Sequence, residues 1–302
     1  MADPVARAEV VRIHAELTRA LAALQARVCA ALEEADGGAT FSTDRWDRPG
    51  GGGGVARVLQ DGPVLEKAGV NLSDVQGEVP AGLAAKLPGD GPEFLAAGLS
   101  IVVHPRSPLV PTAHANVRFL ARGGEAWFGG GADLTPYYLY EEDCAHFHGV
   151  LRDVCEGHLP GSHAGWKRAA DAYFFLPHRA EHRGVGGIFF DGLRGDLDRA
   201  LGLARALPAA FLDAYLPIVA RRRDLPWGAE ERRWQEIRRG RYVEFNLVHD
   251  RGTLFGLETR GRTESVLMSL PPTVRWPYDH RPAPGSREAA LLEVLRAPRD
   301  WA

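Results

Sequence analysis

The stretch from Ser100 to Arg118 constrains the fold most, because it predicts two neighbouring strands joined by a stiff loop. An apolar run ends at His104, three prolines follow within seven residues, and a second run then alternates polar with apolar residues. In a strand successive side chains point to opposite faces, so His114, Asn116 and Arg118 share one face. That face presents an imidazole, an amide and a guanidinium in a row.

This polar face has two interpretations. It is either the solvent-exposed side of a half-buried strand, the ordinary case in an antiparallel sheet, or the floor of a binding site. Polar clusters further along the chain favour the second interpretation.

Composition narrows the class of protein. The 302 residues are 45% hydrophobic and 25% charged, with a formal net charge of −3, which is typical of a soluble globular protein. The absence of a basic surplus argues against a nucleic-acid partner. The chain begins without the pattern of a secretory signal, and no apolar run is long enough to span a bilayer, so we expect a cytoplasmic protein without stable membrane insertion. Three cysteines without a CxxC pair are expected to be buried thiols.

Hydrophobic periodicity predicts a long helix over residues 5–35, two or three helices between 198 and 239, and a terminal helix over 287–296. Strands and helices do not alternate regularly enough for a doubly wound parallel sheet. We therefore predict an α+β fold, in which a large, mainly antiparallel sheet is covered by helices on both faces, as a single domain over residues 1–302.

Three local patterns add detail to this fold. Alternation around the turn at 250–252 predicts a hairpin over residues 241–257, and a further strand is expected over 265–272. The glycine run Gly50–Gly54 is not followed by the Lys-Ser or Lys-Thr of a phosphate loop, so it is expected to be a flexible loop edging a site.

A second polar cluster surrounds Asp133, which lies two residues after the triplet Gly129–Gly131. The glycines indicate that backbone or ligand comes very close there. In the helix expected next, His148 borders the apolar face, whereas His146 lies about 200° away around the axis. Only His148 is expected to face inward, as a core residue or as a ligand.

Charged residues gather again from His178 to Arg183, where a helix stops and a strand starts. Such clusters are typical of a site, although an exposed loop would also tolerate them. Further on, Arg260-Gly261-Arg262 places two cations around a glycine, a geometry that suits carboxylates.

Several long contiguous blocks together resemble the oxygen-dependent coproporphyrinogen III oxidases. The blocks are Gly50–Val58, Lys67–Ser73, His104–Arg118, Trp127–Pro136, Tyr173–Asp191 and Tyr242–Pro272. The resemblance covers nearly the whole chain and implies homodimers with a broad antiparallel sheet between helices. The activity it implies converts two propionates of coproporphyrinogen III to vinyl groups, with O2 as co-substrate, and gives protoporphyrinogen IX.

The resemblance also implies site residues. His114 matches the proton donor of the family, and Asp133 matches the aspartate that follows the glycine triplet. Substrate-binding positions are implied at Ser100, Asn116, Val117, Arg118, Arg260, Gly261 and Arg262. Four histidines are assigned to a divalent metal such as Mn2+ in bacterial members, and they match His104, His114, His148 and His178. Arg260 departs from the small residue or proline of many members, so backbone recognition by that turn could be altered.

The expected chemistry suits these residues. The substrate is a flexible macrocycle of four electron-rich pyrroles with four propionates, which Arg118 and Arg262 would hold. Asp133 would accept the pyrrole N–H groups and stabilise positive charge on the ring, while His114 would move protons as CO2 leaves. No organic cofactor is expected, because the pyrrole itself can donate electrons to O2 and the chain has neither a dinucleotide fingerprint nor an iron–sulfur cysteine cluster.

The sequence alone does not decide whether the four histidines bind a metal, or which class of function the chain has. No HExxH motif is present, and His146 and His148 diverge on a helix, so nothing demonstrates that the four histidines converge. A metal-dependent oxidoreductase or hydrolase would use the same histidines. A non-catalytic tetrapyrrole carrier would need the arginines but not Asp133.

Overall fold

The structure is a computed structural model that describes residues 4–79, 88–258 and 262–302. Its centre is a seven-stranded antiparallel sheet in the order β1-β2-β3-β4-β5-β6-β9. The strands are β1 (Ser42–Asp47), β2 (Gly52–Gln60), β3 (Leu65–Glu78), β4 (Glu93–Pro105), β5 (Thr112–Arg122), β6 (Glu125–Thr135) and β9 (Gly187–Leu193). A separate pair joins β7 (Phe175–Leu176) to β8 (Glu181–His182).

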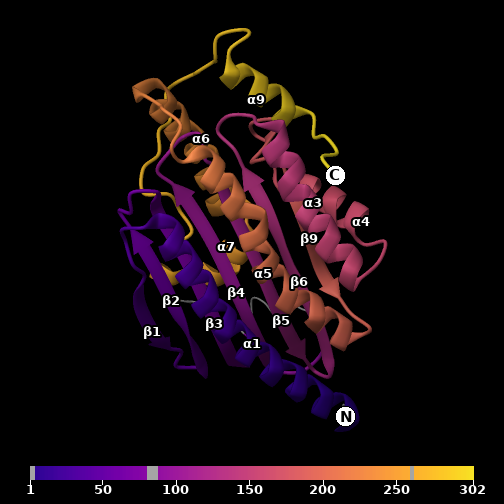
Figure 1. Ribbon diagram of the computed structural model, residues 1–302. Helices are drawn as coiled ribbons and strands as arrows, with labels where there is room; N and C mark the ends of the chain where they lie inside the picture. The colour runs from indigo at the N-terminus through magenta and orange to yellow at the C-terminus, as the bar shows by residue number, and fades with distance from the viewer. Residues whose placement is uncertain (1–3, 80–87, 259–261) are drawn as a thin grey trace.

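Helices pack on both faces of this sheet. They are α1 (Pro4–Asp36), α3 (Glu141–His158), α4 (His163–Tyr173), α5 (Leu197–Arg222), α6 (Ala229–Val248), α7 (Arg251–Glu258), α8 (Thr263–Leu267) and α9 (Arg287–Arg296). Figure 1 shows α1 and α5 lying across the front of the sheet. Residues of α6, α7 and α8 face its opposite side across a cavity. The predicted α+β fold is therefore confirmed.

The two faces of the sheet differ in polarity because β4 and β5 alternate as predicted. On β5, Ala115, Val117 and Phe119 are buried in the main hydrophobic cluster with α1 and α5, while the residues between them are partly exposed. Gln25 of α1 links the helix to the sheet, because its Nε2 donates hydrogen bonds to two sheet carbonyls. The polar side of β5 is left for the cavity.

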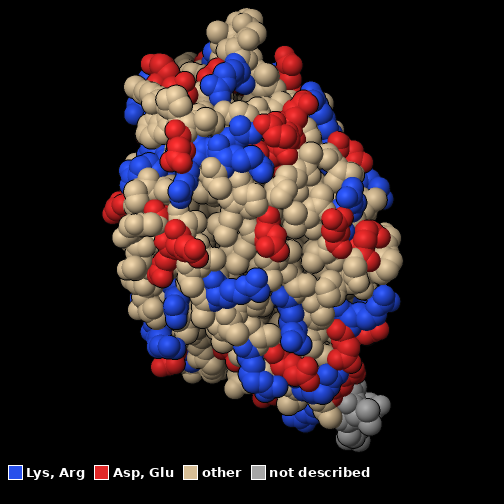
Figure 2. Space-filling view, viewed as in Figure 1, with Lys and Arg blue, Asp and Glu red and all other residues tan. Residues whose placement is uncertain are grey.

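Helix α5 is the one helix among the described residues that is long and apolar enough to span a membrane. It is a core helix, since 61% of its apolar window is buried. Tyr215 of α5 also donates a 3.0 Å hydrogen bond to the carbonyl of Pro111. On the face that carries α1 and α5, Figure 2 shows basic and acidic side chains interspersed, without a broad area of one sign.

The hairpin predicted over residues 241–257 is wrong, because this segment forms the end of α6 and most of α7. Tyr242, Phe245 and Asn246 are buried at helical spacing, so the alternation was a partial view of a three- and four-residue repeat. Asp250 does not make a hairpin turn; its Oδ2 accepts a 2.7 Å hydrogen bond from the backbone N–H of Thr253 at the start of α7.

The strand predicted over residues 265–272 is also wrong, since α8 occupies its first part. Two carbonyls that follow α8 accept hydrogen bonds from side chains of β3 and β4. The carbonyl of Ser269 accepts a 2.8 Å hydrogen bond from His104 Nε2, and that of Leu270 accepts one of 2.8 Å from Lys67 Nζ. The expected glycine loop is partly strand as well, because β2 begins at Gly52.

Candidate active site

A cavity of about 320 Å³ lies between the polar face of the sheet and the helices α4, α6, α7 and α8. Its floor crosses the sheet from Trp46 on β1 to Gly131 on β6. The volume falls in the range of small-molecule sites, and most of the lining is apolar with a few convergent polar groups. The cavity is therefore the candidate active site.

His114 and Asp133 meet in this cavity because they are directly opposite each other in the β5–β6 register. His114 Nδ1 donates to Asp133 Oδ1 at 2.9 Å, and Asn116 Nδ2 donates to His114 Nε2 at 3.2 Å. These partners fix the ring orientation and place the Nε2 edge toward the cavity. His114 is partly exposed there, whereas the side chain of Asp133 is only 2% exposed.

Arg183, which also lines the cavity, completes the group. Its Nη2 donates to both carboxylate oxygens of Asp133 at 2.8 Å, and its Nη1 donates to Asn246 Oδ1 at 2.7 Å. The guanidinium also lies 4.4 to 4.7 Å from the centres of three aromatic rings. Those rings belong to Phe174, Tyr242 and Phe245. Arg183 is thus a buried cation packed among aromatic rings at the cavity.

This cage sets the charge of Asp133. Burial raises the pKa of the carboxyl, but the charge of Arg183 and the hydrogen bond from His114 outweigh burial, so the net pKa lies below its ordinary value. Asp133 is therefore ionised at neutral pH, and it orients His114 with a fixed negative charge.

The glycine triplet makes room around this group, as the sequence indicated. A Cβ on Gly129 would lie 2.8 Å from Arg118 Nε, and one on Gly131 would lie 2.4 Å from the carbonyl oxygen of Ile188. Any larger residue at Gly129 would displace the Arg118 guanidinium, which pairs with Asp191 at 3.0 Å on the cavity wall.

The sequence pattern of the coproporphyrinogen III oxidases matches residues 16–301. The chain belongs to the coproporphyrinogen III oxidase family. It is thus an oxidoreductase of porphyrin synthesis that acts on coproporphyrinogen, and a tetrapyrrole substrate is consistent with this family. The resemblance drawn from the sequence is confirmed.

The substrate-binding positions expected of a coproporphyrinogen oxidase fall mostly on this cavity. Ser100, Asn116, Val117, Arg118 and Arg262 all contribute to its lining. Arg262 Nε donates to Asp44 Oδ2 at 2.6 Å, which ties the start of α8 to β1. Arg260 and Gly261 lie outside the described residues.

Sequence reasoning missed two groups that this cavity brings in. Arg183 stood in the charged cluster at 178–183, but only the fold shows that it is buried against Asp133. Asp250 was assigned to a turn, yet it lines the cavity and accepts a 2.8 Å hydrogen bond from the hydroxyl of Tyr173. The charged cluster was the only sequence signal for Arg183, and no sequence signal marked Asp250 as a cavity residue.

The four histidines expected to hold a metal are not brought together. Of the four, only His114 lines the cavity. His148 is fully buried, its Nε2 donates to the carbonyl of Val185, and burial lowers its pKa to about 4. His178 lies partly exposed beside Glu244 and His249. The described part of the chain contains no group of three or more His, Cys, Asp or Glu placed to hold a metal, so these residues do not fit the expected site.

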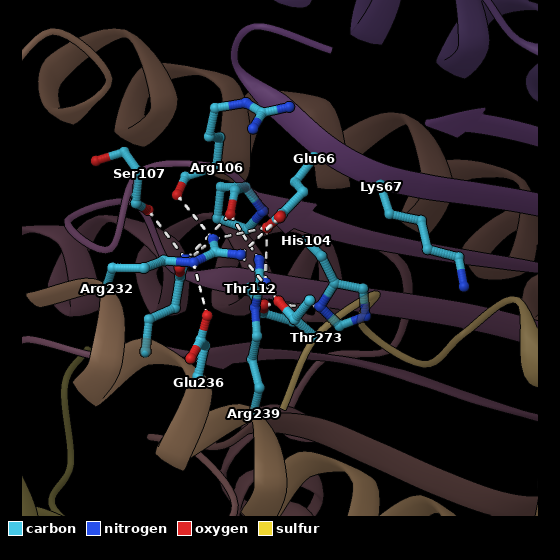
Figure 3. A network of polar contacts seen from close by, with 12 residues as sticks. Glu66, Lys67, His104, Arg106, Ser107, Thr112, Arg232, Glu236, Arg239 and Thr273 are labelled. Atoms are coloured by element: carbon cyan, nitrogen blue, oxygen red, sulfur yellow. Dashed lines mark hydrogen bonds and ion pairs between the residues drawn. The ribbon is translucent and has the colours of Figure 1, made fainter. Parts of the chain in front are cut away.

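His104 has a different position, inside the polar network of Figure 3. Its Nε2 donates to the carbonyl of Ser269 at 2.8 Å, so its Nδ1 accepts from Thr112 Oγ1 at 3.1 Å. Thr112 Oγ1 in turn accepts a 2.6 Å hydrogen bond from Tyr137. Both ring nitrogens are therefore engaged, and the residue anchors the chain after α8 that walls the cavity.

The same network holds a buried ion-pair cluster. Figure 3 shows Arg232 and Arg239 converging on Glu66, with distances of 2.6 and 2.7 Å. Burial raises the pKa of Glu66, but the two arginines outweigh burial and lower it below its ordinary value. Arg239 also donates to the carbonyl of Pro105 at 2.8 Å, which secures the end of β4.

Proposed function

We propose that the chain catalyses the O2-dependent oxidative decarboxylation of two propionates of coproporphyrinogen III to vinyl groups, giving protoporphyrinogen IX. For each propionate, the bond between the carboxylate and its neighbouring carbon breaks to release CO2, and the side-chain carbon attached to the pyrrole gives up one hydrogen with two electrons. O2 accepts these together with one proton and becomes H2O2, and the two side-chain carbons are left joined by the vinyl double bond. The observation that carries the proposal is the chain of contacts from Arg183 through Asp133 to His114 in the cavity.

His114 is the group best placed to transfer protons during the decarboxylation. Its Nε2 edge faces the cavity, and its ring is held by Asp133 on one side and Asn116 on the other. An imidazole held in this orientation is suited to general acid–base transfer of a proton to or from a bound substrate. Asp133 itself is too deeply buried to accept the pyrrole N–H groups, so we assign it the task of orienting His114 and stabilising the imidazolium.

Other cavity groups are suited to hold the substrate. Arg118 and Arg262 are partly exposed cations on the cavity wall, where propionates can compete for them with their acidic partners. Asn71 Oδ1 and Ser265 Oγ line the cavity and have no hydrogen-bond partner within the described residues. Buried polar atoms in proteins usually have a hydrogen-bond partner. Since these two have none in the described part of the chain, they are free to bond to a ligand.

The requirement for O2 is tested with purified protein and coproporphyrinogen III. In air we expect CO2 release, O2 uptake and the fluorescence of protoporphyrin after chemical oxidation of the product. Under argon we expect none of these. Equal turnover in the two atmospheres would contradict the proposal.

Activity is expected to survive exhaustive metal removal, because the four histidines do not share a site among the described residues. The measurement is turnover before and after dialysis against a chelator, with residual metal determined by mass spectrometry. Loss of turnover that Mn2+ restores would show that a metal is required. No organic cofactor enters the proposed reaction.

We also propose that the enzyme is a cytoplasmic homodimer. In support, the end of α6 and the adjoining α7 carry exposed apolar side chains at Leu247, Val248, Leu254 and Leu257. Exposed apolar side chains gathered on neighbouring helices are typical of a protein interface. Light scattering coupled to size exclusion is expected to give twice the mass of one chain, and a monomer at micromolar concentration would contradict the proposal.

A further inference from the structure

Arg48 lines the end of the cavity formed by β1 and the turn that follows it. Its Nη1 donates a 3.0 Å hydrogen bond to the carbonyl of Gln76. Its guanidinium also lies over the ring of Phe94, 5.4 Å from the ring centre. Two contacts therefore fix the direction of this cation at the cavity edge.

The glycine run next to Arg48 leaves the space that the guanidinium occupies. A Cβ on Gly50 would lie 3.0 Å from Arg48 Nη1, and a Cβ on Gly77 would lie 3.3 Å from the same nitrogen. Gly77 also has a φ of +139°, which favours glycine. Gly50 of the glycine run and Gly77 of β3 thus leave the space that the charged side chain of Arg48 fills.

Arg48 differs from the other cavity arginines in its partners. Arg118, Arg183 and Arg262 each pair with a carboxylate of the chain. Within residues 4–79, 88–258 and 262–302, Arg48 has no carboxylate at ion-pair distance, and only Nη1 has a hydrogen-bond partner. Trp46 of β1 lines the same end of the cavity, and its buried indole N–H has no hydrogen-bond partner in these ranges. Two sets of donors are therefore unused at this end of the cavity.

The position of Arg48 complements that of His114. The register runs from Trp46 through Gly54, Ser73 and Gly98 to Arg118, so β1 and β5 are four strand steps apart. At about 4.8 Å for each step, β1 and β5, the strand that carries His114, are roughly 19 Å apart. A macrocycle that carries carboxylates around its rim would reach from one strand to the other.

We propose that Arg48 binds a carboxylate of the tetrapyrrole substrate that does not react, and so sets which propionates lie near His114. This inference rests on the proposed function, because it takes the substrate to be a tetrapyrrole with several propionates. A guanidinium with free Nη2 and Nε donors is suited to bidentate carboxylate binding.

The test is a fluorescence titration with coproporphyrin III, the aromatic tetracarboxylate that cannot react further. Arg48→Met is expected to raise Kd roughly ten-fold, because it removes a charge-assisted pair but keeps an apolar stem over Phe94. Arg48→Lys is expected to recover part of the affinity. The matched control is Arg45→Met on β1, where the side chain is exposed and does not line the cavity.

A second ligand separates the contribution of the carboxylates from that of the macrocycle. The tetramethyl ester of coproporphyrin III is expected to bind wild-type protein and Arg48→Met equally. An unchanged Kd for the tetracarboxylate in Arg48→Met, or an equal rise for acid and ester, would overturn the inference. Failure of the proposed function is seen separately, as wild-type protein that binds the tetracarboxylate but releases no CO2 from coproporphyrinogen in air.

Discussion

Replacing Asp133 with asparagine is expected to lower kcat for coproporphyrinogen by about 100-fold or more, the range that a positioned proton-transfer group contributes. The amide has no negative charge with which to orient His114, and it leaves the buried cation of Arg183 without its partner. KM is expected to change little, because the carboxylate is only 2% exposed and does not face the substrate. Steady-state kinetics on protein shown to be folded by circular dichroism provide the measurement.

The chain offers a closely matched control for this substitution. His14 and Asp74 form a second histidine–aspartate pair, with a distance of 2.8 Å, between α1 and β3. Asp74→Asn removes the same charge outside the cavity and is expected to leave kcat unchanged. A kcat in Asp133→Asn within a few-fold of wild type would contradict the assigned role, and a large rise in KM alone would instead indicate direct substrate contact.

Replacing Arg183 with methionine is expected to lower the free energy of unfolding by about 3 to 5 kcal/mol at pH 7, because it leaves a buried carboxylate unpaired. Both side chains are almost fully buried, at 3% and 2% exposure. Urea unfolding followed by circular dichroism gives this value. Arg194→Met is the control, since its partly exposed pair with Glu125 is expected to contribute less than about 1 kcal/mol.

The loss of unfolding free energy in Arg183→Met is expected to be larger at pH 7 than at pH 4. In the wild type, burial raises the pKa of Asp133, but Arg183 and His114 more than offset this, so the folded pKa lies below 3.8. The stabilisation is therefore complete above that pH and is lost as the pH falls through the folded value. Without Arg183, burial dominates and Asp133 favours its protonated form, so the variant loses stability as the pH rises from 4 to 7. A gap between the two proteins that is as large at pH 4 as at pH 7 would contradict this account.

The sequence was sufficient to predict the polar face of β5, because the alternation of side chains along a strand is a local property. The positions of His114, Asn116 and Arg118 followed from alternation alone, and the glycine triplet correctly indicated close approach beside Asp133. Such signals need no knowledge of which distant segment packs against them.

The remaining features depended on long-range packing. Arg183 became recognisable only when the fold buried it against Asp133, 50 residues away along the chain. The segment around Tyr242 fits a strand or a helix over a short window, and in the structure it is a helix that buries Tyr242, Phe245 and Asn246. The metal prediction required four segments to converge, and no local pattern reports whether they do.

The most direct test of the account is CO2 release from carboxyl-labelled coproporphyrinogen III in air by wild-type protein and by His114→Gln. Coproporphyrin III binding is measured in parallel to show that the variant retains its cavity. We predict that the wild type releases two CO2 for each substrate molecule, and that His114→Gln binds the porphyrin normally but releases CO2 about 100-fold more slowly or not at all. CO2 release by His114→Gln at the wild-type rate would contradict the account.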